Sequence, residues 1–182
     1  IYESYNTLKE KLETENMTEL FEQIEMPLSI VLGDMEYDGV YLDEETLKEM
    51  GEEIKIKIEL VSKSIYNMAG CEFNISSPSQ LGEILFEKLE LPHGKKGKTG
   101  YSTAIDVLNK LKGKQPIIEE IIEYRMLTKL YTTYIEGLLE SKFNDGKIHT
   151  IYTQALTRTG RLSSIEPNLQ NIPVRQEAGR LF

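Results

Sequence analysis

The sequence has little of several features that would narrow its class. It contains one cysteine, Cys71, in 182 residues, which excludes an internal disulfide framework and fits a reducing compartment. No run approaches the roughly 20 apolar residues that a membrane span needs, and the first residues do not resemble a signal peptide. Repeats and low-complexity tracts are absent. With 40% hydrophobic and 28% charged residues, the composition is that of a soluble globular protein with no membrane partner.

Metal-binding patterns are also lacking. The two histidines, His93 and His149, are far apart in the sequence, and neither is paired with Cys71. Aspartate and glutamate are common, but none of them forms a recognised ligand spacing. We therefore expect this chain to bind no metal.

Basic residues are fewer than acidic ones, 21 against 30, for a net charge of −9. Taken alone, this charge argues against nucleic acid as a partner, because an acidic protein repels phosphate. The charge is uneven, however. Residues 1–60 hold 5 basic and 17 acidic residues, whereas residues 61–182 hold 16 and 13. The whole-chain value therefore does not exclude an anionic partner for the last two thirds.

Two apolar stripes with helical spacing dominate the sequence. The first predicts a long helix over about 43–70, with Asp43 as its N-cap; its positions are Leu47, Met50, Ile54, Ile58, Val61, Ile65 and Met68. The second predicts a long helix over about 116–140; its positions are Ile117, Ile121, Tyr124, Leu127, Tyr131, Tyr134 and Leu138. Narrow stripes of this kind favour pairing with one other helix, so we expect an antiparallel two-helix arm. Residues 71–115 form its tip.

The expected tip contains two short helices and a basic loop between them. Ser77 begins a capping box with proline at the first helical position, and Ser102-Thr103 are expected to cap the second helix. The loop holds three lysines and no acidic residue between Gly94 and Thr103. Its Gly-Lys-Thr resembles a phosphate-binding loop, but Pro92 stands where that motif requires glycine, so we reject a nucleotide site. Backbone phosphates and a merely solvated loop both remain open interpretations.

Around the arm the patterns are weaker. The acidic first segment predicts a helix up to about Ile24, and Pro27 suits the first turn of a second helix that should stop at Asp38-Gly39. After the arm, Lys147 to Tyr152 alternates like a strand. The overall class is therefore mainly α, with a short β or irregular segment at the end.

The most informative stretch runs from Thr157 to Arg175 and has little to bury. It combines hydroxyls, amides and arginines, which can donate and accept hydrogen bonds to sugars, phosphates and minor-groove acceptors. Its strings Thr-Gly-Arg-Leu-Ser-Ser (159–164) and Pro-Asn-Leu-Gln-Asn-Ile-Pro (167–173) resemble the start of the palm in family A DNA polymerases of the bacterial DNA polymerase I type. Glu123-Tyr124-Arg125 with Lys129-Leu130 resembles the second long thumb helix of that family, and 73–103 resembles its thumb tip.

The resemblance implies a domain plan and a partner. Residues 1–25 are the end of an exonuclease-like domain or a connector, residues 26–143 the thumb, and residues 144–182 a truncated start of the palm. The partner is primer–template DNA, which the fragment grips as a monomer in the bacterial cytoplasm, at the nucleoid. The implied DNA contacts are Asn74, Ser76, Ser77, Lys95, Lys98, Thr99, Ser102, Thr103, Arg125, Lys129, Arg161, Asn168, Gln170 and Asn171.

The resemblance also implies what this fragment lacks. Family A enzymes join a primer 3′-hydroxyl to a deoxynucleoside triphosphate in DNA replication and repair, with Mg²⁺ held by palm aspartates. No carboxylate of this chain matches those aspartates, so the fragment alone is expected to be inactive. The alternative interpretation is a non-enzymatic helical hairpin that docks a protein partner through its apolar stripes and tyrosines.

Overall fold

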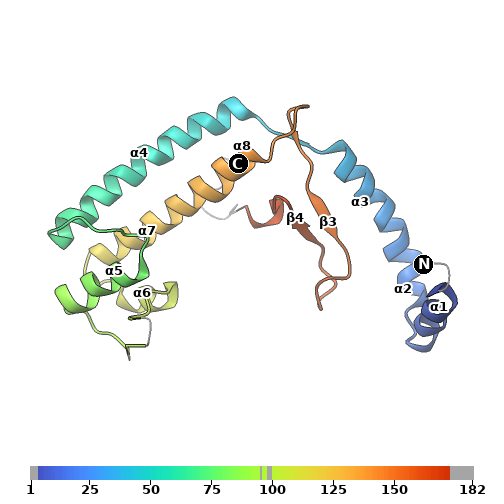
Figure 1. Ribbon diagram of the computed structural model, residues 1–182, viewed down its shortest axis with the longest axis horizontal. Helices are drawn as coiled ribbons and strands as arrows, with labels where there is room; N and C mark the ends of the chain where they lie inside the picture. The colour runs from blue at the N-terminus through green and yellow to red at the C-terminus, as the bar shows by residue number, and fades with distance from the viewer. Residues whose placement is uncertain (1–3, 95, 98–99, 173–182) are drawn as a thin grey trace. The chain divides into compact units, whose positions relative to one another are not determined.

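A computed structural model describes residues 4–94, 96–97 and 100–172. The chain is mainly helical with a few short strands, as the sequence predicts (Figure 1). It divides into two compact units, one formed by Glu44–Glu136 and the other by Ile1–Asp43 together with Gly137–Phe182. Among the described residues, no helix is both long enough and apolar enough to cross a membrane.

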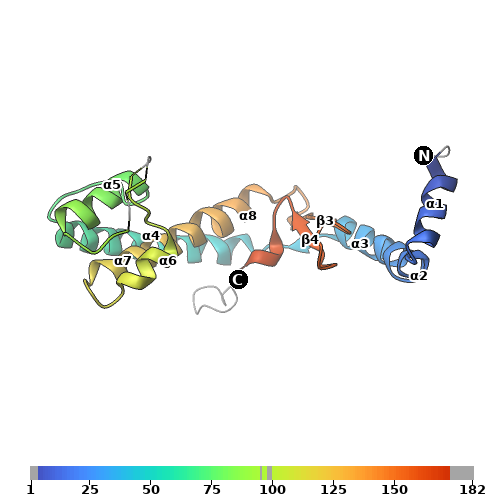
Figure 2. The ribbon, with the colours of Figure 1, turned by 90° about the horizontal axis from the view of Figure 1, so that it is seen from below.

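The first unit is built on two long helices that lie side by side and run antiparallel (Figures 1 and 2). One is α4, Glu44–Ala69, whose 26 residues span about 39 Å at 1.5 Å per residue. The other begins as α7, Ile117–Lys129, and continues through a π-helical segment, Leu130–Glu136. The expected pair of antiparallel helices is therefore confirmed.

The seam between these helices is formed by part of the expected stripes. Leu47, Ile54 and Ile65 of α4 are at most 5% exposed, whereas the other members of that stripe are only partly buried. Gly51 allows a close approach, since a Cβ atom there would lie 3.1 Å from Cγ2 of Ile135. The π segment widens the turn and changes the buried face. Leu130 and Ile135, which lie outside the expected stripe, are therefore both buried in it.

The tip packs on the far end of this pair. Its helices are α5, Pro78–Gly82, a π segment, Glu83–Lys88, and α6, Ile105–Leu111. One apolar cluster joins the tip to both long helices; its least exposed members are Ile65, Ala69, Ile75, Leu81, Leu85, Leu108, Ile117, Ile118 and Ile121. The tip is thus held rigidly on the pair by a common core, which places its loops with respect to α7.

The second unit begins with four helical segments instead of the two expected helices. They are α1, α2, a π segment and α3, and their bounds are Tyr5–Thr14, Thr18–Leu20, Phe21–Glu25 and Met26–Asp38. The helix expected up to about Ile24 is broken at Asn16, whose φ is +55°. Pro27 lies in the first turn of α3, directly after the π segment. Gly39 ends α3 with φ +65°, as predicted.

Two small antiparallel sheets complete this unit. In the first, β1, Val40–Tyr41, pairs with β2, Lys147–Ile148, and in the second, β3, Ile151–Thr153, pairs with β4, Ser163–Ile165. The expectation of one strand from Lys147 to Tyr152 is therefore wrong. The strand is interrupted at Thr150, whose side chain is buried and bonded to Ile165 at the end of β4 and to Pro167 after it. A 3₁₀ turn, Leu169–Asn171, comes last among the described elements.

Candidate nucleic-acid interface

A groove of about 590 Å³ lies between the tip and α7 in the first unit. It brings together four of the fourteen residues expected to contact DNA, which are Ser76, Thr103, Arg125 and Lys129. The remaining lining residues are Pro78, Ala104, Tyr124, Thr128 and Thr132. None of these described lining residues is acidic, so the groove offers cations and hydroxyl groups to a ligand.

Sequence reasoning missed two hydroxyl groups of this groove. Thr128 and Thr132 line it from the same helix as Arg125 and Lys129. The Thr128 Oγ1 atom is buried without a hydrogen-bond partner among the described residues, whereas Thr132 Oγ1 donates to the Thr128 carbonyl at 2.9 Å. The spacing along the chain is the signal that could have found both threonines: Thr128 lies three residues after Arg125, and Thr132 lies three residues after Lys129. Residues three or four apart share a helix face.

Arg125 and Thr103 hold the tip to α7 at this groove. One terminal nitrogen of Arg125 donates to the Thr103 carbonyl, and the other donates to Thr103 Oγ1 at 3.1 Å. Thr103 is 4% exposed, and burial lowers the pKa of the Arg125 guanidinium. Lys129, one turn further along the helix, is exposed. The two expected basic contacts thus differ, because Lys129 is exposed whereas Arg125 is partly buried and bonded to Thr103.

The expected cap of the second tip helix is wrong. The N-cap of α6 is Ala104, whose methyl group cannot accept a hydrogen bond, and the Thr103 hydroxyl is bonded to Arg125 instead of to the helix. Ser102 is exposed, and its Oγ accepts from the Ala104 N–H only at 3.5 Å. Ser102 therefore keeps its hydroxyl at the surface of the tip.

Hydrogen bonds within the turn before α5 orient three further expected residues. Ser77 caps α5 as predicted, and its Oγ accepts from the Gln80 N–H at 3.4 Å. The Gln80 side chain, however, accepts from the Asn74 N–H at 2.7 Å instead of closing the box on Ser77. Asn74 Oδ1 accepts from the Ser76 N–H at 3.0 Å. Asn74 and Ser76 are exposed on this internally bonded turn.

The lysines of the basic loop do not all have the same role. Lys96 forms an ion pair with Glu87 at 2.8 Å and lies 4.8 Å from the centre of the Tyr101 ring. The hydrogen bond between them raises the pKa of Lys96 and lowers that of Glu87. Lys96 is therefore engaged within the tip. The expected contacts Lys95, Lys98 and Thr99 lie outside the described residues.

The second unit carries the remaining expected residues, on the segment around β3 and β4. Arg161 is exposed, in the loop that joins these strands. The Thr157 hydroxyl donates to the Arg161 carbonyl at 2.9 Å, and Gly160 has φ +70°. Because this bond closes a short loop, the backbone at Arg161 is fixed while its side chain points into solvent.

A buried pair of hydroxyls supports the turn that follows β4. Thr150 Oγ1 and Ser164 Oγ lie 2.7 Å apart, and Thr150 Oγ1 also lies 2.9 and 2.8 Å from the carbonyls of Ile165 and Pro167. Ser164 Oγ accepts from the Leu169 N–H at 3.1 Å. These contacts fix the first residue of the 3₁₀ turn. Sequence analysis did not predict that these two hydroxyl groups hold the turn in place.

The three amides of the 3₁₀ turn differ in what they can offer. Asn168 caps the turn, since its Oδ1 accepts from the N–H groups of Gln170 and Asn171 at 3.1 and 3.2 Å. All three residues are exposed. The structure therefore brings Asn168, Gln170 and Asn171 together on one short turn, as an amide cluster at the surface of the second unit.

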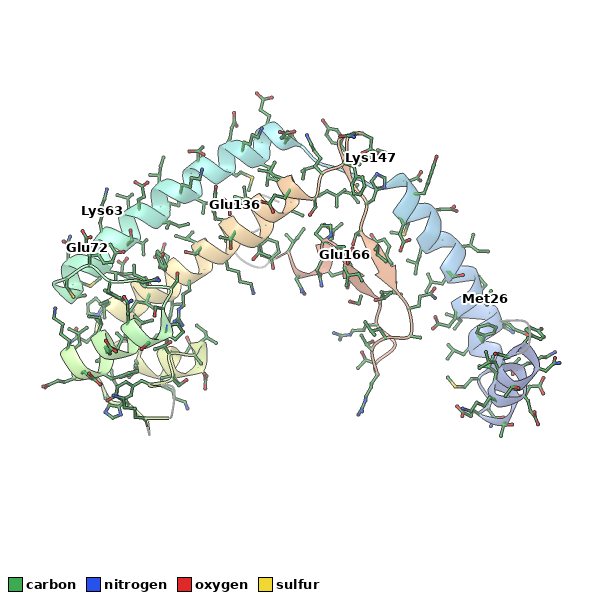
Figure 3. The ribbon with its side chains drawn as sticks, in the orientation of Figure 1. Met26, Lys63, Glu72, Glu136, Lys147 and Glu166 are labelled. Carbon is green, nitrogen blue, oxygen red and sulfur yellow. The ribbon has the colours of Figure 1, made fainter. Side chains whose placement is uncertain are left out.

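In the same unit, two basic side chains, one on β2 and one directly after it, bind the end of α3. Lys147 Nζ donates to the Asp38 carbonyl at 2.7 Å (Figure 3). His149 Nδ1 donates to the Glu36 carbonyl at 2.7 Å, and its Nε2 lies 2.9 Å from Asp145 Oδ2. The Glu36 carbonyl and the Asp145 carboxylate raise the pKa of His149. Cations at a helix C-terminus are favourable, so these contacts have a structural function.

No metal centre is present in the described part of the chain. Residues 4–94, 96–97 and 100–172 contain no group of three or more histidines, cysteines, aspartates or glutamates placed to hold a metal ion. The Mg²⁺ that the resemblance implies therefore has no set of ligands among these residues.

Comparison with known proteins identifies the family. Residues 44–182 match DNA polymerase family A. The chain belongs to this family. Its relatives include DNA polymerase I of Bacillus subtilis, 55% identical over 95% of this chain and 20% of the relative's length, and DNA polymerase I of Streptococcus pneumoniae, 51% identical over the whole chain and 21% of the relative. This family A chain therefore spans about a fifth of the curated relatives it matches.

A solved structure extends the likeness of this family A chain to three dimensions. It is described as the POL domain of Pol1 from M. smegmatis in complex with DNA primer-template and dNTP. The TM-score is 0.87 and the identity 39%, over 97% of this chain and 31% of the other. The mainly helical fold and the polymerase family expected from the sequence are thus both confirmed.

Proposed function

We propose that this chain is the thumb and the start of the palm of a DNA polymerase, and that it grips the primer–template duplex. The thumb is assigned to residues 26–143 and the start of the palm to 144–182, and residues 1–25 are the end of an exonuclease-like domain or a connector. Support comes from the relatives named DNA polymerase I and from the solved relative, which is in complex with DNA primer-template and dNTP.

One observation carries this proposal, the groove between the tip and α7. Its described lining combines the exposed Lys129 with several hydroxyl groups and has no acidic residue, although the chain as a whole has a net charge of −9. Such a lining suits the anionic backbone of DNA, since lysine and hydroxyl groups are common phosphate partners. The proposed contacts in this unit are Asn74, Ser76, Ser77, Ser102 and Lys129, with Lys95, Lys98 and Thr99 of the basic loop.

The second unit has a different role in this proposal. Arg161 and the amide cluster of Asn168, Gln170 and Asn171 face the minor groove near the primer terminus. Amide and guanidinium donors match the acceptors that every base pair presents there, so the contact follows duplex shape and not sequence. The backbone around these side chains is fixed by the Thr157 and Thr150 bonds, which supports a defined contact.

The chemistry of the whole protein is assigned to residues outside this chain. We propose that the full-length protein is a DNA-directed DNA polymerase of replication and repair. Its Mg²⁺ and its deoxynucleoside triphosphate are held by side chains that this chain does not contain. The 182-residue chain alone binds DNA as a monomer but incorporates no nucleotide. The bacterial cytoplasm, at the nucleoid, is the proposed location.

A salt titration tests the DNA grip. The affinity of the 182-residue chain for a labelled primer–template duplex is measured by fluorescence anisotropy between about 50 and 200 mM salt. We expect weak binding without sequence preference, with an association constant that falls linearly on logarithmic axes. Lys129→Gln should lower the slope by about 0.9, the value of one phosphate contact. Lys63→Gln is the matched control, because Lys63 is exposed in the same unit and does not line the groove.

The alternative function has an outcome of its own in this titration. In that alternative the apolar stripes and tyrosines of the helical hairpin dock a protein partner; Ile56 and Leu60 of α4, which lie outside the stripe, are also 59% and 61% exposed. Binding that does not change with salt, or no binding at low salt, would contradict the DNA grip and favour this alternative.

A further inference from the structure

The bond pair between Arg125 and Thr103 links two parts of the chain that are 22 residues apart. Arg125 lies on α7, and Thr103 lies at the corner where the basic loop turns into α6. The carbonyl and the hydroxyl of Thr103 both accept from the same guanidinium, one at each terminal nitrogen. Such a two-pronged contact fixes the direction of the corner as well as its position, because the guanidinium is planar and rigid.

This contact between Arg125 and Thr103 is largely buried in the tip. Thr103 is 4% exposed, so its hydroxyl is not accessible to a ligand. Arg125 is partly desolvated, and among the described residues no carboxylate is paired with it. The hydrogen bonds of its two terminal nitrogens go to the two oxygens of Thr103. A partly buried charge that has only these partners holds them firmly.

The residue next to Thr103 is placed differently. Ser102 is exposed, and its hydroxyl makes only a long contact of 3.5 Å with the Ala104 N–H. On the other side of the corner, Leu108 and Leu111 of α6 are buried in the common core. The corner is thus anchored at one end by apolar packing and at the other by Arg125, and Ser102 is the part that remains at the surface.

We infer that Arg125 is a positioning residue of the DNA grip: it holds the corner of residues 102–104 so that Ser102 meets the duplex, and it does not itself bind a phosphate. This inference rests on the proposed function of the groove. Lys129, one turn along α7 and exposed, makes the direct phosphate contact. Two basic residues four apart on one helix face therefore have different functions.

The inference is tested by measuring two quantities for the full-length protein: its affinity for DNA, and the dependence of that affinity on salt. Primer–template binding is measured without nucleotide over the salt range given above for the wild type, Lys129→Gln, Arg125→Gln, Arg125→Lys and Thr103→Val. A residue that neutralises a phosphate contributes about 0.9 to the salt slope. A residue that only positions the uncharged corner of residues 102–104 contributes to the affinity for DNA but not to the salt slope.

The expected results distinguish Arg125 from Lys129. Arg125→Gln should weaken binding by about tenfold with an unchanged slope. Arg125→Lys should weaken it similarly, because lysine keeps the charge but cannot reproduce the fork. Thr103→Val should weaken binding in the wild type and have little further effect in Arg125→Gln, since both remove the same contact. Lys129→Gln should lower the slope by about 0.9.

Other results would overturn the inference while leaving the DNA grip intact. They are a slope lowered by about 0.9 in Arg125→Gln together with wild-type affinity in Arg125→Lys, or unchanged affinity in Thr103→Val. If Arg125→Gln loses its helical circular dichroism, Thr103→Val decides alone, because it retains the arginine. Salt-independent binding of the wild type would contradict the proposed function itself.

Discussion

The imidazole ring of His149 occupies the space that a side chain at Gly39 would fill. A Cβ atom on Gly39 would lie 2.7 Å from Cε1 of the ring and 2.9 Å from Nδ1. Nδ1 is also the atom that donates to the Glu36 carbonyl. The end of α3 and the residue that follows β2, His149, are therefore joined by a contact that only glycine permits.

Gly39→Ala should destabilise the chain by about 2 kcal/mol or more. Gly39 has φ +65° and ψ 178°, a region essentially restricted to glycine, and forcing another residue there costs about 1–3 kcal/mol. The alanine methyl would also displace the ring from Glu36. Urea unfolding followed by circular dichroism measures the change.

Gly33→Ala is the matched control for this substitution. Gly33 lies within α3, and a Cβ atom there would have no atom within 4 Å. Alanine in a helix interior is more favourable than glycine by about 0.5–1 kcal/mol, so this variant should be slightly more stable than the wild type. Equal effects of the two substitutions would contradict the proposed contact of Gly39 with His149.

Stability should fall as the pH rises through the pKa of His149. Both ring nitrogens face oxygen acceptors, Glu36 and Asp145, so the observed geometry requires the charged imidazolium. The Glu36 carbonyl first, and Asp145 second, raise the pKa of His149, while nearby Lys147 lowers it. The stabilisation by this imidazolium is complete below the ordinary histidine pKa of about 6.5. It is lost as the pH rises through the raised pKa of His149. Urea unfolding at a series of pH values measures it.

The contribution of the Asp145 carboxylate to stability depends on pH in the opposite direction. The hydrogen bond from His149 lowers the pKa of Asp145, so its contribution is present above the ordinary value of about 3.9 and disappears as the pH falls through the lowered value. In His149→Gln the loss of stability as the pH rises above about 6.5 should vanish, whereas His93→Gln should retain it. A pH profile unchanged in His149→Gln would exclude this pair as its cause.

Thr150→Val should loosen the turn that carries the amide cluster. The valine retains the shape of the side chain but removes the 2.7 Å partner of Ser164 Oγ and the hydroxyl that lies 2.9 Å from the Ile165 carbonyl. Leaving buried polar groups unsatisfied costs about 1–3 kcal/mol. Hydrogen exchange at Leu169, Gln170 and Asn171 should become faster. Thr159→Val, at an exposed position, should change neither stability nor exchange.

Arg161→Ala should slow primer extension by the full-length protein much more than it weakens DNA binding. The proposed contact lies at the primer terminus, where a lost interaction affects the reacting end. We expect at least about a tenfold lower rate of extension, or about 1.4 kcal/mol in activation free energy. Arg158→Ala is the control, because Arg158 is also exposed in the β3–β4 loop. Normal extension by Arg161→Ala would contradict its assigned role.

Local signals in the sequence predicted the helix ends and the pairing of the long helices. Gly39 ends α3 and Ser77 caps α5, because each effect depends on neighbours within a few residues. The apolar stripe of α4 identified Leu47, Ile54 and Ile65 as buried. The π segment after Lys129 was not predicted, so the burial of Leu130 and Ile135 was missed. Spacing alone assumes 3.6 residues per turn, which a π turn does not follow.

The failures at the candidate site involve residues distant in sequence. Thr103 was expected to cap a helix, but Arg125, 22 residues away, takes its hydroxyl. Thr150 was placed in a continuous strand, but Ser164 removes it from that strand. Both threonines form a hydrogen bond with a residue that is distant in sequence, which the spacing of neighbouring residues does not reveal. The sequence therefore indicates which residue types lie near the site, and the tertiary contacts decide which of them remain available.

The hydrogen bonds that Asn168 makes within its own turn limit its ability to discriminate between base pairs. Its oxygen already accepts from two backbone N–H groups, so the side chain retains only the two hydrogens of its NH₂ group. On the proposed interface it can give but not receive a hydrogen bond. The exocyclic amine of guanine is the one donor in the minor groove, and Asn168 is unable to pair with it. By capping its own turn, this residue becomes indifferent to the feature that distinguishes G·C from A·T.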